Sequence, residues 1–389
     1  MKEYQLSDLI EIKHGYAFDG EHIVTEDNGV VLVTPGNFKI GGGFQEEKCK
    51  FFNGEIPEEY VLSSGDYIVT MTDLSKTIDT LGYSAIVPSS KNRTYLHNQR
   101  IGLIKFISDE CDPDYIYYLM QTHKYQRAIA NTSTGATVHH TSPSKIRAYK
   151  FFAPDLEAQK QIARTLRVYD DLIENNQKQI KLLEEAAQRL YKEWFVDLRF
   201  PGYENTPITD GIPQGWNKEL VGNVIEKSYR SKQVMTADYL AEGKIPIIDQ
   251  SRDFIAGYTD DEETLVSLGK PVIVFGDHTR VLKYIQFPFA KGADGTQLIV
   301  SKCENMPQSL LYLSLFNIDL SNYHYARHFK YLKAEEIIIP SVGVATKFDY
   351  FVSPIFKKVQ VLRDQIIGAQ QARDRLLPKL MSGELEVLK

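Results

Sequence analysis

The sequence predicts an α+β protein in which two mixed α/β globular segments are each followed by a long helix. Three observations support this architecture. Residues 148–154 and residues 334–340 both begin with Ala and end with Pro, and they align without a gap at a spacing of 186 (340 − 154 = 186). After each copy the apolar residues recur with a helical period. Before each copy, short apolar runs alternate with turn residues, as they do in strands, so we treat the chain as an internal repeat.

The two helical segments share a heptad seam. The apolar steps alternate between four and three residues in both copies, which is the spacing of a coiled coil. The first helix follows Pro154 and could extend to about Phe195, which is roughly 60 Å at about 1.5 Å per residue. The first seam consists of Ile162, Leu166, Tyr169, Ile173, Asn176, Ile180, Leu183, Ala187, Leu190 and Trp194. The second consists of Phe348, Val352, Ile355, Val359, Leu362, Ile366, Ala369, Arg373, Leu376 and Leu380.

The second helix differs from the first at its prolines. Ser353 followed by Pro354 is typical of a helix start. Pro378 removes a helical hydrogen bond and clashes with the preceding turn, so we expect the helix to end near Leu377. The second helix is therefore expected to be shorter than the first, or broken into two pieces. Asn176 has two interpretations, a device that fixes the helix register or a polar residue at the edge of the helix pair.

Some apolar residues lie outside the seam. Such residues either form surfaces for partner proteins or pack against a globular segment, and the sequence leaves both interpretations open. They are Leu182, Tyr191, Phe195, Phe351 and Phe356.

Composition indicates a globular protein of at least two domains. The chain has 389 residues, of which 43% are hydrophobic and 25% charged. A net charge of −6 argues mildly against a protein coated in nucleic acid, but it allows a local basic face. No apolar run reaches membrane-spanning length and the N-terminus has no apolar signal region, so we expect a cytoplasmic protein with no membrane association. The three cysteines lack CxxC spacing, which favours ordinary reduced thiols.

The patterns also give segment boundaries. The globular segments begin and end alike while their middles differ, which suggests one fold with two sets of loops; Gln99 near the end of the first matches Gln297 in the second. Runs at residues 29–33, 67–69 and 101–104 predict strands, and residues 114–129 predict a helix. The expected segments are globular residues 1–153, helix 154–199, a Pro- and Gly-rich linker 200–211, globular residues 212–339 and helix 340–389.

Common catalytic and metal-binding motifs are absent. The sequence has no GxxxxGK[ST], HExxH or GxSxG pattern, and the glycine run at residues 41–43 lacks the GxGxxG form. Ser142 and Lys145 fit SxxK but have no companion motifs. His139 and His140 are adjacent, and adjacent residues on a strand point to opposite faces, which disfavours a shared metal. We therefore expect no catalytic residue, no metal site and no cofactor in this chain.

Polar side chains suited to DNA gather in turns of both globular segments. Arg and Lys supply charge for phosphates, and Asn, Gln and Arg can make paired hydrogen bonds to purine edges in the major groove. Any single residue could equally belong to an ordinary polar loop, but two such groups on two paired segments favour nucleic acid. The candidates are Lys76, Arg93, Asn98, Gln99, Arg100, Thr137, His139 and His140 in the first segment, and His278, Thr279, Arg280, Lys283, Gln297, His324, Arg327 and Lys330 in the second.

The order of motifs resembles the specificity (S) subunits of type I restriction-modification systems. Ile212-Pro-Gln-Gly-Trp216 is similar to that family's domain-opening motif. Residues 146–162 resemble its passage from a target-recognition domain into a conserved helix, and residues 373–383 resemble its distal conserved region. The first segment departs from the pattern, because Tyr4-Gln5-Leu6 stands where a Trp-containing opening is expected.

The resemblance implies a specific architecture and role. The two helices would pack as an antiparallel coiled coil with pseudo-twofold symmetry and separate two target-recognition domains. Each domain would read one half of a split site in double-stranded DNA. The helices would set the unread gap and provide a docking surface for two DNA methyltransferase subunits, with restriction subunits as further possible partners. The chain itself would be non-catalytic, and S-adenosylmethionine, ATP and Mg²⁺ would bind the partner subunits of this phage-defence complex.

Three alternatives remain open from the sequence. One is a specificity protein of the same fold that serves a methylation-only or another phage-defence system, which differs only in its partners. Another is a coiled-coil scaffold whose globular ends bind proteins, which the heptads and the low net charge also fit. The third is an enzyme of unfamiliar type.

Overall fold

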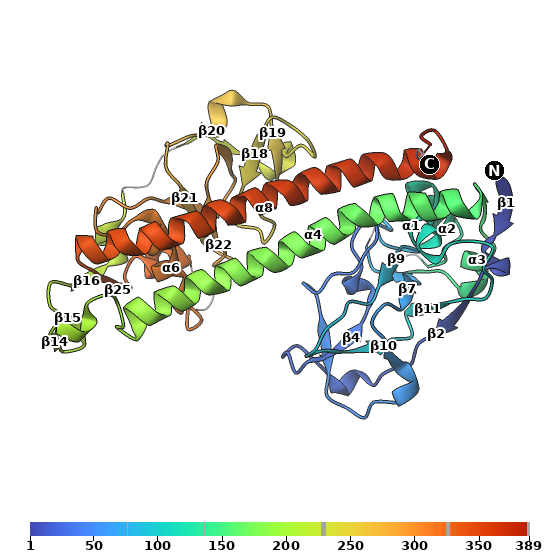
Figure 1. The fold of residues 1–389 in the computed structure, drawn as a ribbon, viewed down its shortest axis with the longest axis horizontal. Coiled ribbons are helices and arrows are strands. Elements are labelled where there is room, and N and C mark those ends of the chain that lie inside the picture. Colours follow the sequence, from blue (N-terminus) through green and yellow to red (C-terminus); the bar gives the residue numbers. More distant parts are fainter. Residues whose placement is uncertain (76, 136, 227–230, 324–326, 387–389) are drawn as a thin grey trace. The chain divides into compact units, whose positions relative to one another are not determined.

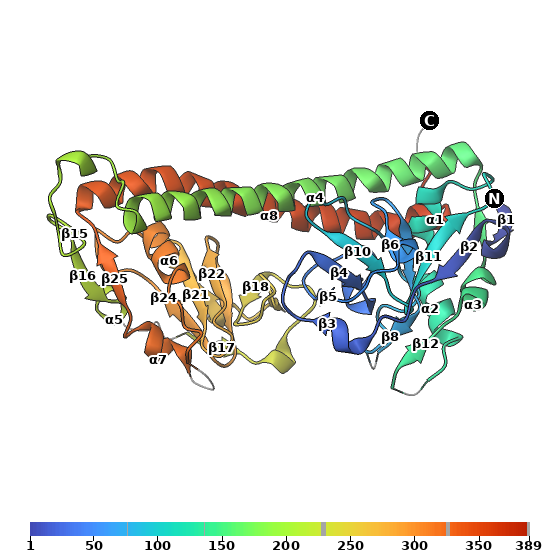
Figure 2. The same cartoon turned by 90° about the horizontal axis from the view of Figure 1, so that it is seen from below.

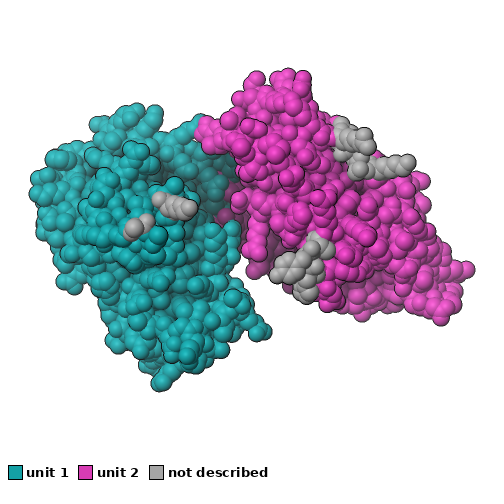
Figure 3. All heavy atoms as spheres, turned by 180° about the vertical axis from the view of Figure 1, so that it is seen from behind, with its two compact units in different colours: residues 1–173, 367–389 teal, residues 174–366 magenta. Residues whose placement is uncertain are grey.

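The chain was described from a computed structural model, which covers residues 1–75, 77–135, 137–226, 231–323 and 327–386 (Figure 1). Contacts divide it into two compact units, which Figure 3 colours separately. Unit 1 consists of residues 1–173 and 367–389, and unit 2 of residues 174–366. The division falls inside both long helices, so each unit contains one globular part and a stretch of each helix.

The long helices are α4 (Leu156–Tyr191) and α8 (Val342–Ser382), both visible in Figure 1. A π-helical turn, Lys192–Val196, follows α4. Within unit 2, Asn176 Nδ2 donates to Gln365 Oε1 (3.1 Å) and Arg363 Nη2 donates to Glu184 Oε1 (2.7 Å). From Asn176 to Glu184 the residue numbers rise along α4, while those of their partners on α8 fall from 365 to 363. The two helices are therefore antiparallel.

Asn176 is buried in the helix pair, which favours the register interpretation over a position at the edge. Its side chain is 2% exposed and its hydrogen bond partner, Gln365, is on the other helix. A buried amide that has one partner at one register disfavours every other register, in which it would lose that hydrogen bond.

The prediction of a shorter or broken second helix was wrong. α8 has 41 residues against 36 in α4, and both Pro354 and Pro378 lie inside it. A proline frees the carbonyl of the residue four positions earlier, here Tyr350 and Asp374. All four of these residues are exposed, so water can bind the freed carbonyls. The opposite face of α8 is buried and keeps the helix continuous.

The globular part of unit 1 is built from two main sheets. In the first, β4 (Val30–Val33) and β10 (Thr94–His97) are parallel neighbours, flanked by β5 (Lys50–Phe52), β3 (Ile23–Val24) and β6 (Val61–Leu62). The second has the order β2 (Ile10–His14), β11 (Ile101–Phe106), β7 (Tyr67–Thr70) and β9 (Ser84–Ile86). Two smaller ladders join β1 (Lys2–Gln5) to β13 (Lys150–Ala153) and β8 (Thr72–Asp73) to β12 (His139–His140).

The three strands predicted from apolar runs are confirmed as β4, β7 and β11, whereas the helix predicted over residues 114–129 is two helices. These are α1 (Pro113–Leu119) and α2 (His123–Asn131). Thr122 separates them, because its side chain accepts a hydrogen bond from Tyr125 N and caps the start of α2. A third short helix, α3 (Pro143–Arg147), precedes β13.

The globular part of unit 2 is also built from two main sheets. One sheet has the order β17 (Gln233–Val234), β23 (Phe289–Gly292), β18 (Ile245–Ile248) and β19 (Gly257–Thr259), with β20 (Leu265–Val266) also on β23. The other has the order β22 (Leu282–Ile285), β21 (Val272–Gly276) and β24 (Thr296–Ile299). The remaining elements are β14 (Ile208–Thr209), β15 (Ile212–Pro213), β16 (Asn217–Leu220), β25 (Glu336–Ile339), α5 (Val221–Val224), α6 (Gln308–Phe316) and α7 (His328–Leu332).

Strand pairing shows that the two globular parts share one topology. In unit 1, β10 lies parallel to β4, and His97 is opposite Val33. In unit 2, β23 lies parallel to β18 in the same way, and Lys291 is opposite Ile248. β7 is central between β9 and β11, as β21 is between β22 and β24. The expectation of one frame with two sets of loops is therefore confirmed at the level of the strands.

The residue match between Gln99 and Gln297 was wrong. Met71 N donates to Arg100 O (2.9 Å) in unit 1, and Asp277 N donates to Gly295 O (2.7 Å) at the same place in unit 2. Arg100 therefore corresponds to Gly295. Gln99 lies in the turn before β11, whereas Gln297 lies inside β24.

A short helix connects each globular part to the long helices. In unit 1, α1 shares a hydrophobic cluster with residues of α4 and α8, and Tyr118 Oη donates to Asp170 Oδ2 (2.7 Å) on α4. In unit 2, α6 shares a cluster with strands β21 and β24 and with both long helices (Figure 2), and Ser309 Oγ donates to Asp349 Oδ1 (2.5 Å) on α8.

In the described part of the chain, no helix is both long and apolar enough to cross a membrane.

Candidate nucleic-acid interface

In unit 1, two polar groups that are distant in sequence meet around Met71. Met71 N donates to Arg100 O (2.9 Å), and Met71 O accepts from Thr141 N (3.0 Å). Beside it, β12 pairs with β8, so that His139 lies opposite Asp73 and His140 opposite Thr72. We call this meeting of the β10–β11 turn, the β7–β8 connection and the β12 segment the unit 1 junction.

Several predicted residues lie on the surface of the unit 1 junction. Gln99, Arg100, Thr137 and His140 are exposed, and His139 is half-buried. His140 Nδ1 lies 3.1 Å from Thr72 Oγ1, which holds the imidazole against β8. An amide, a guanidinium, a hydroxyl and an imidazole exposed on neighbouring turns can hydrogen-bond base edges and phosphates.

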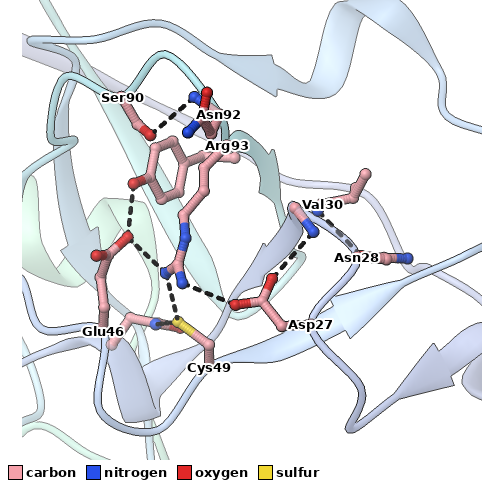
Figure 4. Close-up of polar contacts among 11 residues, drawn as sticks. Asp27, Asn28, Val30, Glu46, Cys49, Ser90, Asn92 and Arg93 are labelled. Carbon is pink, nitrogen blue, oxygen red and sulfur yellow. Dashed lines mark hydrogen bonds and ion pairs between the residues drawn. The ribbon is translucent and has the colours of Figure 1, made fainter. Parts of the chain in front are cut away.

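Two predicted DNA contacts in unit 1 have structural partners instead. Asn98 is 8% exposed, and its Oδ1 accepts from Arg100 N (3.0 Å), so it shapes the turn. The Arg93 guanidinium lies 2.9 Å from carboxylate oxygens of both Asp27 and Glu46 (Figure 4). Burial or paired carboxylates leave these side chains little capacity to bind DNA, which argues against both predictions. Lys76 lies outside the described residues.

Polar contacts around Arg93 form a cluster at the sheet that contains β10. Tyr95 Oη donates to Glu46 Oε1 (2.7 Å), and burial together with the Glu46 carboxylate raises the pKa of Tyr95 above its ordinary value. Cys49 Sγ lies 3.9 Å from Arg93 Nη1, and burial raises the pKa of this thiol (Figure 4). The cluster therefore joins β10 to the loops that flank β4 and β5.

Unit 2 forms an equivalent meeting of turns around Asp277. Asp277 N donates to Gly295 O (2.7 Å), and Asp277 O accepts from His328 N (2.9 Å). The Asp277 carboxylate accepts from Phe329 N (2.8 Å), and the His328 ring contacts carbonyl oxygens of Asp277 (2.8 Å) and Tyr323 (2.9 Å). These bonds tie the β21–β22 turn, the β23–β24 turn and the start of α7 into the unit 2 junction.

The predicted residues of unit 2 divide between surface and interior. His278, Thr279, Arg280, Arg327 and Lys330 are exposed. Arg280 has a positive φ of 61° and its Nη1 donates to Leu320 O (3.1 Å), so part of its donor capacity holds the turn. Gln297 is half-buried on β24, and His324 lies outside the described residues.

Lys283 is not a surface residue, which argues against its predicted role as a DNA contact. It lies on β22 with 5% exposure, its Nζ donates to Asp253 O, and Nζ is 3.9 Å from Asp249 Oδ1. Burial lowers the pKa of Lys283 to about 8, although Asp249 and Asp253 oppose the shift. Its position on a strand of the core explains the burial, which residue type alone does not predict.

Sequence reasoning missed Gln250, which connects two turns of the unit 2 junction. Its Oε1 accepts from His278 N (3.1 Å), its Nε2 donates to Asp294 O (2.8 Å), and its backbone O accepts from Thr279 Oγ1 (2.6 Å). A Cβ placed on Gly295 would lie 2.9 Å from the Gln250 amide, so glycine permits this close approach. No local sequence signal marks Gln250, because its partners are distant in the chain.

A polar hollow opens beside this junction, and we call it the unit 2 hollow. It brings together three predicted residues, His278, Gln297 and Arg327, with residues that the sequence did not single out. Its lining is Gln233, Asp277, His278, Lys291, Asp294, Gly295, Thr296, Gln297 and Arg327. Within the described ranges, no group of three or more His, Cys, Asp or Glu side chains is placed to hold a metal ion.

The apolar residues outside the helix seam are divided between buried and exposed positions. Tyr191, Phe195 and Phe356 are buried against the globular part of unit 2. Leu182 on α4 is 63% exposed and Phe351 on α8 is 52% exposed. A shallow hollow on α4 is lined by Leu182, Glu185, Ala186, Arg189, Leu190 and Glu193.

Comparison with known proteins confirms the family resemblance predicted from the sequence. Residues 1–185 match the family described as the type I restriction modification DNA specificity domain. The type I restriction enzyme MjaIX specificity subunit of Methanocaldococcus jannaschii is 29% identical over 301 residues, which cover 70% of this chain and 69% of that protein. The putative type I restriction enzyme MjaX specificity subunit of the same organism is 26% identical over 235 residues, covering 55% and 53%.

A solved structure has the same fold. The S subunit of a type I restriction-modification system from M. genitalium superposes with a TM-score of 0.59 at 16% sequence identity. The superposition covers 98% of this chain and 96% of that one. The predicted fold class, two mixed α/β domains and two long helices packed antiparallel, is therefore confirmed.

Proposed function

From the relationship of this chain to the specificity subunits of type I restriction-modification systems, we propose that it is a sequence-specific DNA-binding subunit. Residues 1–153 and residues 212–339 would act as target-recognition domains, and each would read one half of a bipartite site in double-stranded DNA. The observation that carries this proposal is the pair of junctions. The same turns of one fold meet in both units, but they expose different side chains, as two half-sites of different sequence require.

The chemistry of the junctions suits duplex DNA. Gln99 and Arg100 in unit 1, and His278, Thr279 and Arg327 in unit 2, are exposed on turns. Turns are narrow enough to enter a major groove about 12 Å wide, where each base pair displays its own pattern of donors and acceptors. Exposed cations beside them would add contacts to phosphates, which fix position without reading sequence.

The long helices would measure the gap and recruit partners. Because α4 and α8 continue from one unit into the other, their length would determine the number of unread base pairs. The hollow around Leu182 and the exposed Val168 and Leu172 on α4 supply apolar surface for docking. We infer two DNA methyltransferase subunits as partners, with restriction subunits as further ones. Catalysis, S-adenosylmethionine, ATP and Mg²⁺ would reside on those partners, and this chain would be non-catalytic.

The alternative function is a protein-binding scaffold. The exposed apolar residues of α4 and the net charge of −6 fit a scaffold as well as they fit a DNA-binding subunit. A specificity protein of a methylation-only or another phage-defence system would share every feature described here and differ only in its partners.

Selection from random duplexes tests the proposed function. The full chain, co-purified with its partner methyltransferase, would be incubated with random DNA at low salt and the bound duplexes sequenced. We expect two short fixed blocks separated by a constant gap. Recovery of no shared sequence from a complex that has formed would contradict the proposal and favour the scaffold.

A further inference from the structure

Lys291 distinguishes the unit 2 hollow from an ordinary polar surface. It lies half-buried on β23, where it pairs with Gln233 of β17, and both side chains line the hollow. No hydrogen bond or ion pair of its ammonium occurs within the described ranges of unit 2. Burial lowers the pKa of Lys291 below its ordinary value. A partly desolvated cation without a partner is costly unless something outside the chain neutralises it.

The same position in unit 1 is closed. His97 corresponds to Lys291, because the two residues lie opposite the last residues of equivalent strands, Val33 of β4 and Ile248 of β18. The His97 side chain is 1% exposed, and its Nε2 lies 2.8 Å from Ile101 O, so an internal partner satisfies it.

The counterpart of Gln233 is also missing from unit 1. In unit 1 Tyr16 pairs with Asn98, and the equivalent pair in unit 2 is Val234 with Gly292. Gly15, the residue before Tyr16, therefore occupies the position that Gln233 has in unit 2. A Cβ on Gly15 would lie 2.3 Å from Asn98 O, so no side chain fits there. The side chains that Lys291 and Gln233 contribute to the hollow therefore have no exposed counterparts in unit 1.

The concave shape limits what can enter. Base edges of a duplex lie at the bottom of a groove about 8.5 Å deep, where only a protruding turn reaches them. Phosphates protrude from the duplex and can enter a hollow. Lys291, Arg327 and the His278 imidazole supply donors for such an oxygen-rich anion.

Two carboxylates, those of Asp277 and Asp294, also line the hollow. Asp277 is buried and its Oδ1 accepts from Phe329 N, so this carboxylate is engaged within the fold. Asp294 is exposed and would repel an anion from its side of the opening. Lys291 and Arg327 supply the positive charge that would offset this repulsion.

We propose that the unit 2 hollow binds one backbone phosphate of duplex DNA through Lys291 and Arg327. This inference rests on the proposed function and adds to it a contact that sets the position of unit 2 on the duplex without reading bases. Unit 1, whose equivalent site is closed, makes no such contact.

Replacement of Lys291 tests the proposal. The full chain with its partner methyltransferase would be titrated with fluorescent duplexes over a salt series, as wild type, Lys291→Met and Lys291→Arg. Lys291→Met should weaken binding about ten-fold for all sequences, since one charge-assisted contact is lost. The slope of log affinity against log salt should fall by about 0.9, and Lys291→Arg should restore it. The selected half-sites should not change.

A chemical probe locates the contact on DNA. In a series of duplexes that each carry a single neutral methylphosphonate, one substitution beside the unit 2 half-site should weaken wild type. The same substitution should have no further effect on Lys291→Met, because the two changes remove one contact. The exposed Lys218 on β16 is the matched control, and Lys218→Met should leave affinity and salt slope unchanged.

Two results would overturn the inference. Unchanged affinity and salt slope in Lys291→Met would show that the hollow does not hold a phosphate. A relaxed base preference at one position of the unit 2 half-site would show that Lys291 reads a base instead. Failure of the proposed function itself would appear differently, as a wild-type complex that selects no bipartite site.

Discussion

At the scale of single residues, Gln250 holds together two turns of the unit 2 junction that we propose to contact DNA. It joins the turns at His278 and Asp294 through both ends of its amide. Gln250→Ala would leave His278 N without that acceptor and free both turns to sample other positions. We expect a loss of about 1–3 kcal/mol of stability and a broadened unit 2 half-site in duplex selection, with the unit 1 half-site unchanged.

Gln45 provides a matched control for Gln250. Its amide braces backbone carbonyls of Gly36 (2.9 Å) and Phe38 (3.0 Å) in unit 1, away from the unit 1 junction. Gln45→Ala should cost similar stability and leave both half-sites as they are. If Gln250→Ala lowers stability in the same way and keeps its half-site, Gln250 is a structural residue and does not position the reading turns.

Lys283 links the stability of unit 2 to pH. Its pKa falls from the ordinary 10.5 to about 8 in the folded protein, so between these values the unfolded chain binds a proton that the folded chain lacks. Stability attributable to Lys283 is therefore lowest below pH 8 and rises as pH increases toward 10.5. Lys283→Met should remove this rise, which urea unfolding of wild type and variant at pH 8, 9 and 10 would measure.

The same substitution tests whether Lys283 contacts DNA. Because its ammonium is buried against Asp249 and Asp253, Lys283→Met should leave the salt dependence of DNA binding unchanged. A salt slope that falls by about one in Lys283→Met would return the residue to the interface.

Residue type predicted which turns carry polar side chains suited to DNA, but it did not predict that these turns meet or which side chains reach the surface. Gln99, Arg100 and His278 are exposed as a contact requires. Asn98 and Lys283 have equally suitable chemistry but are buried, because their strand and turn positions point them inward. Gln250 escaped prediction because its hydrogen-bond partners lie on distant turns. Lys291 escaped prediction because the hollow that it lines is assembled from segments distant in sequence, which a single sequence does not record.

At the scale of elements, α8 shows that local propensity yields to packing. Pro378 was expected to end the helix, and local rules support that expectation. The helix continues to Ser382 because Leu377, Leu380 and Met381 are buried with the core of unit 1. Heptad periodicity, which reports burial, was the better guide to helix length than the proline.

Pro378→Ala should therefore stabilise the protein. The proline is exposed, so its replacement loses little packing, and alanine restores the N–H that can donate to Asp374 O. We expect a gain of up to about 3 kcal/mol, measured by thermal or urea unfolding. Pro143 is the control, since it occupies the first turn of α3, where proline is tolerated, and Pro143→Ala should change stability little. A loss of stability in Pro378→Ala would mean that the proline ring itself is needed for packing.

At the scale of the whole molecule, the proposed ruler depends on both helices being extended in register. The unit boundary falls at residues 173–174 in α4 and residues 366–367 in α8, and Asn176 bonds Gln365 close to it. Three heptads added to each helix at this boundary would lengthen the pair by about 31 Å and keep the seam on one face. One turn of DNA is about 34–36 Å, or about 10 base pairs.

A matched insertion of three heptads should consequently widen the selected gap by about nine or ten base pairs and leave both half-sites intact. A single heptad is a less suitable test, because a gap widened by about three base pairs also rotates one half-site around the duplex relative to the other. Insertion into α4 alone should abolish bipartite selection, since it separates Asn176 from Gln365 and breaks the register. If duplex selection with the matched insertion returns the original gap, the helices do not measure the distance between half-sites, and the gap must be set by the partner subunits.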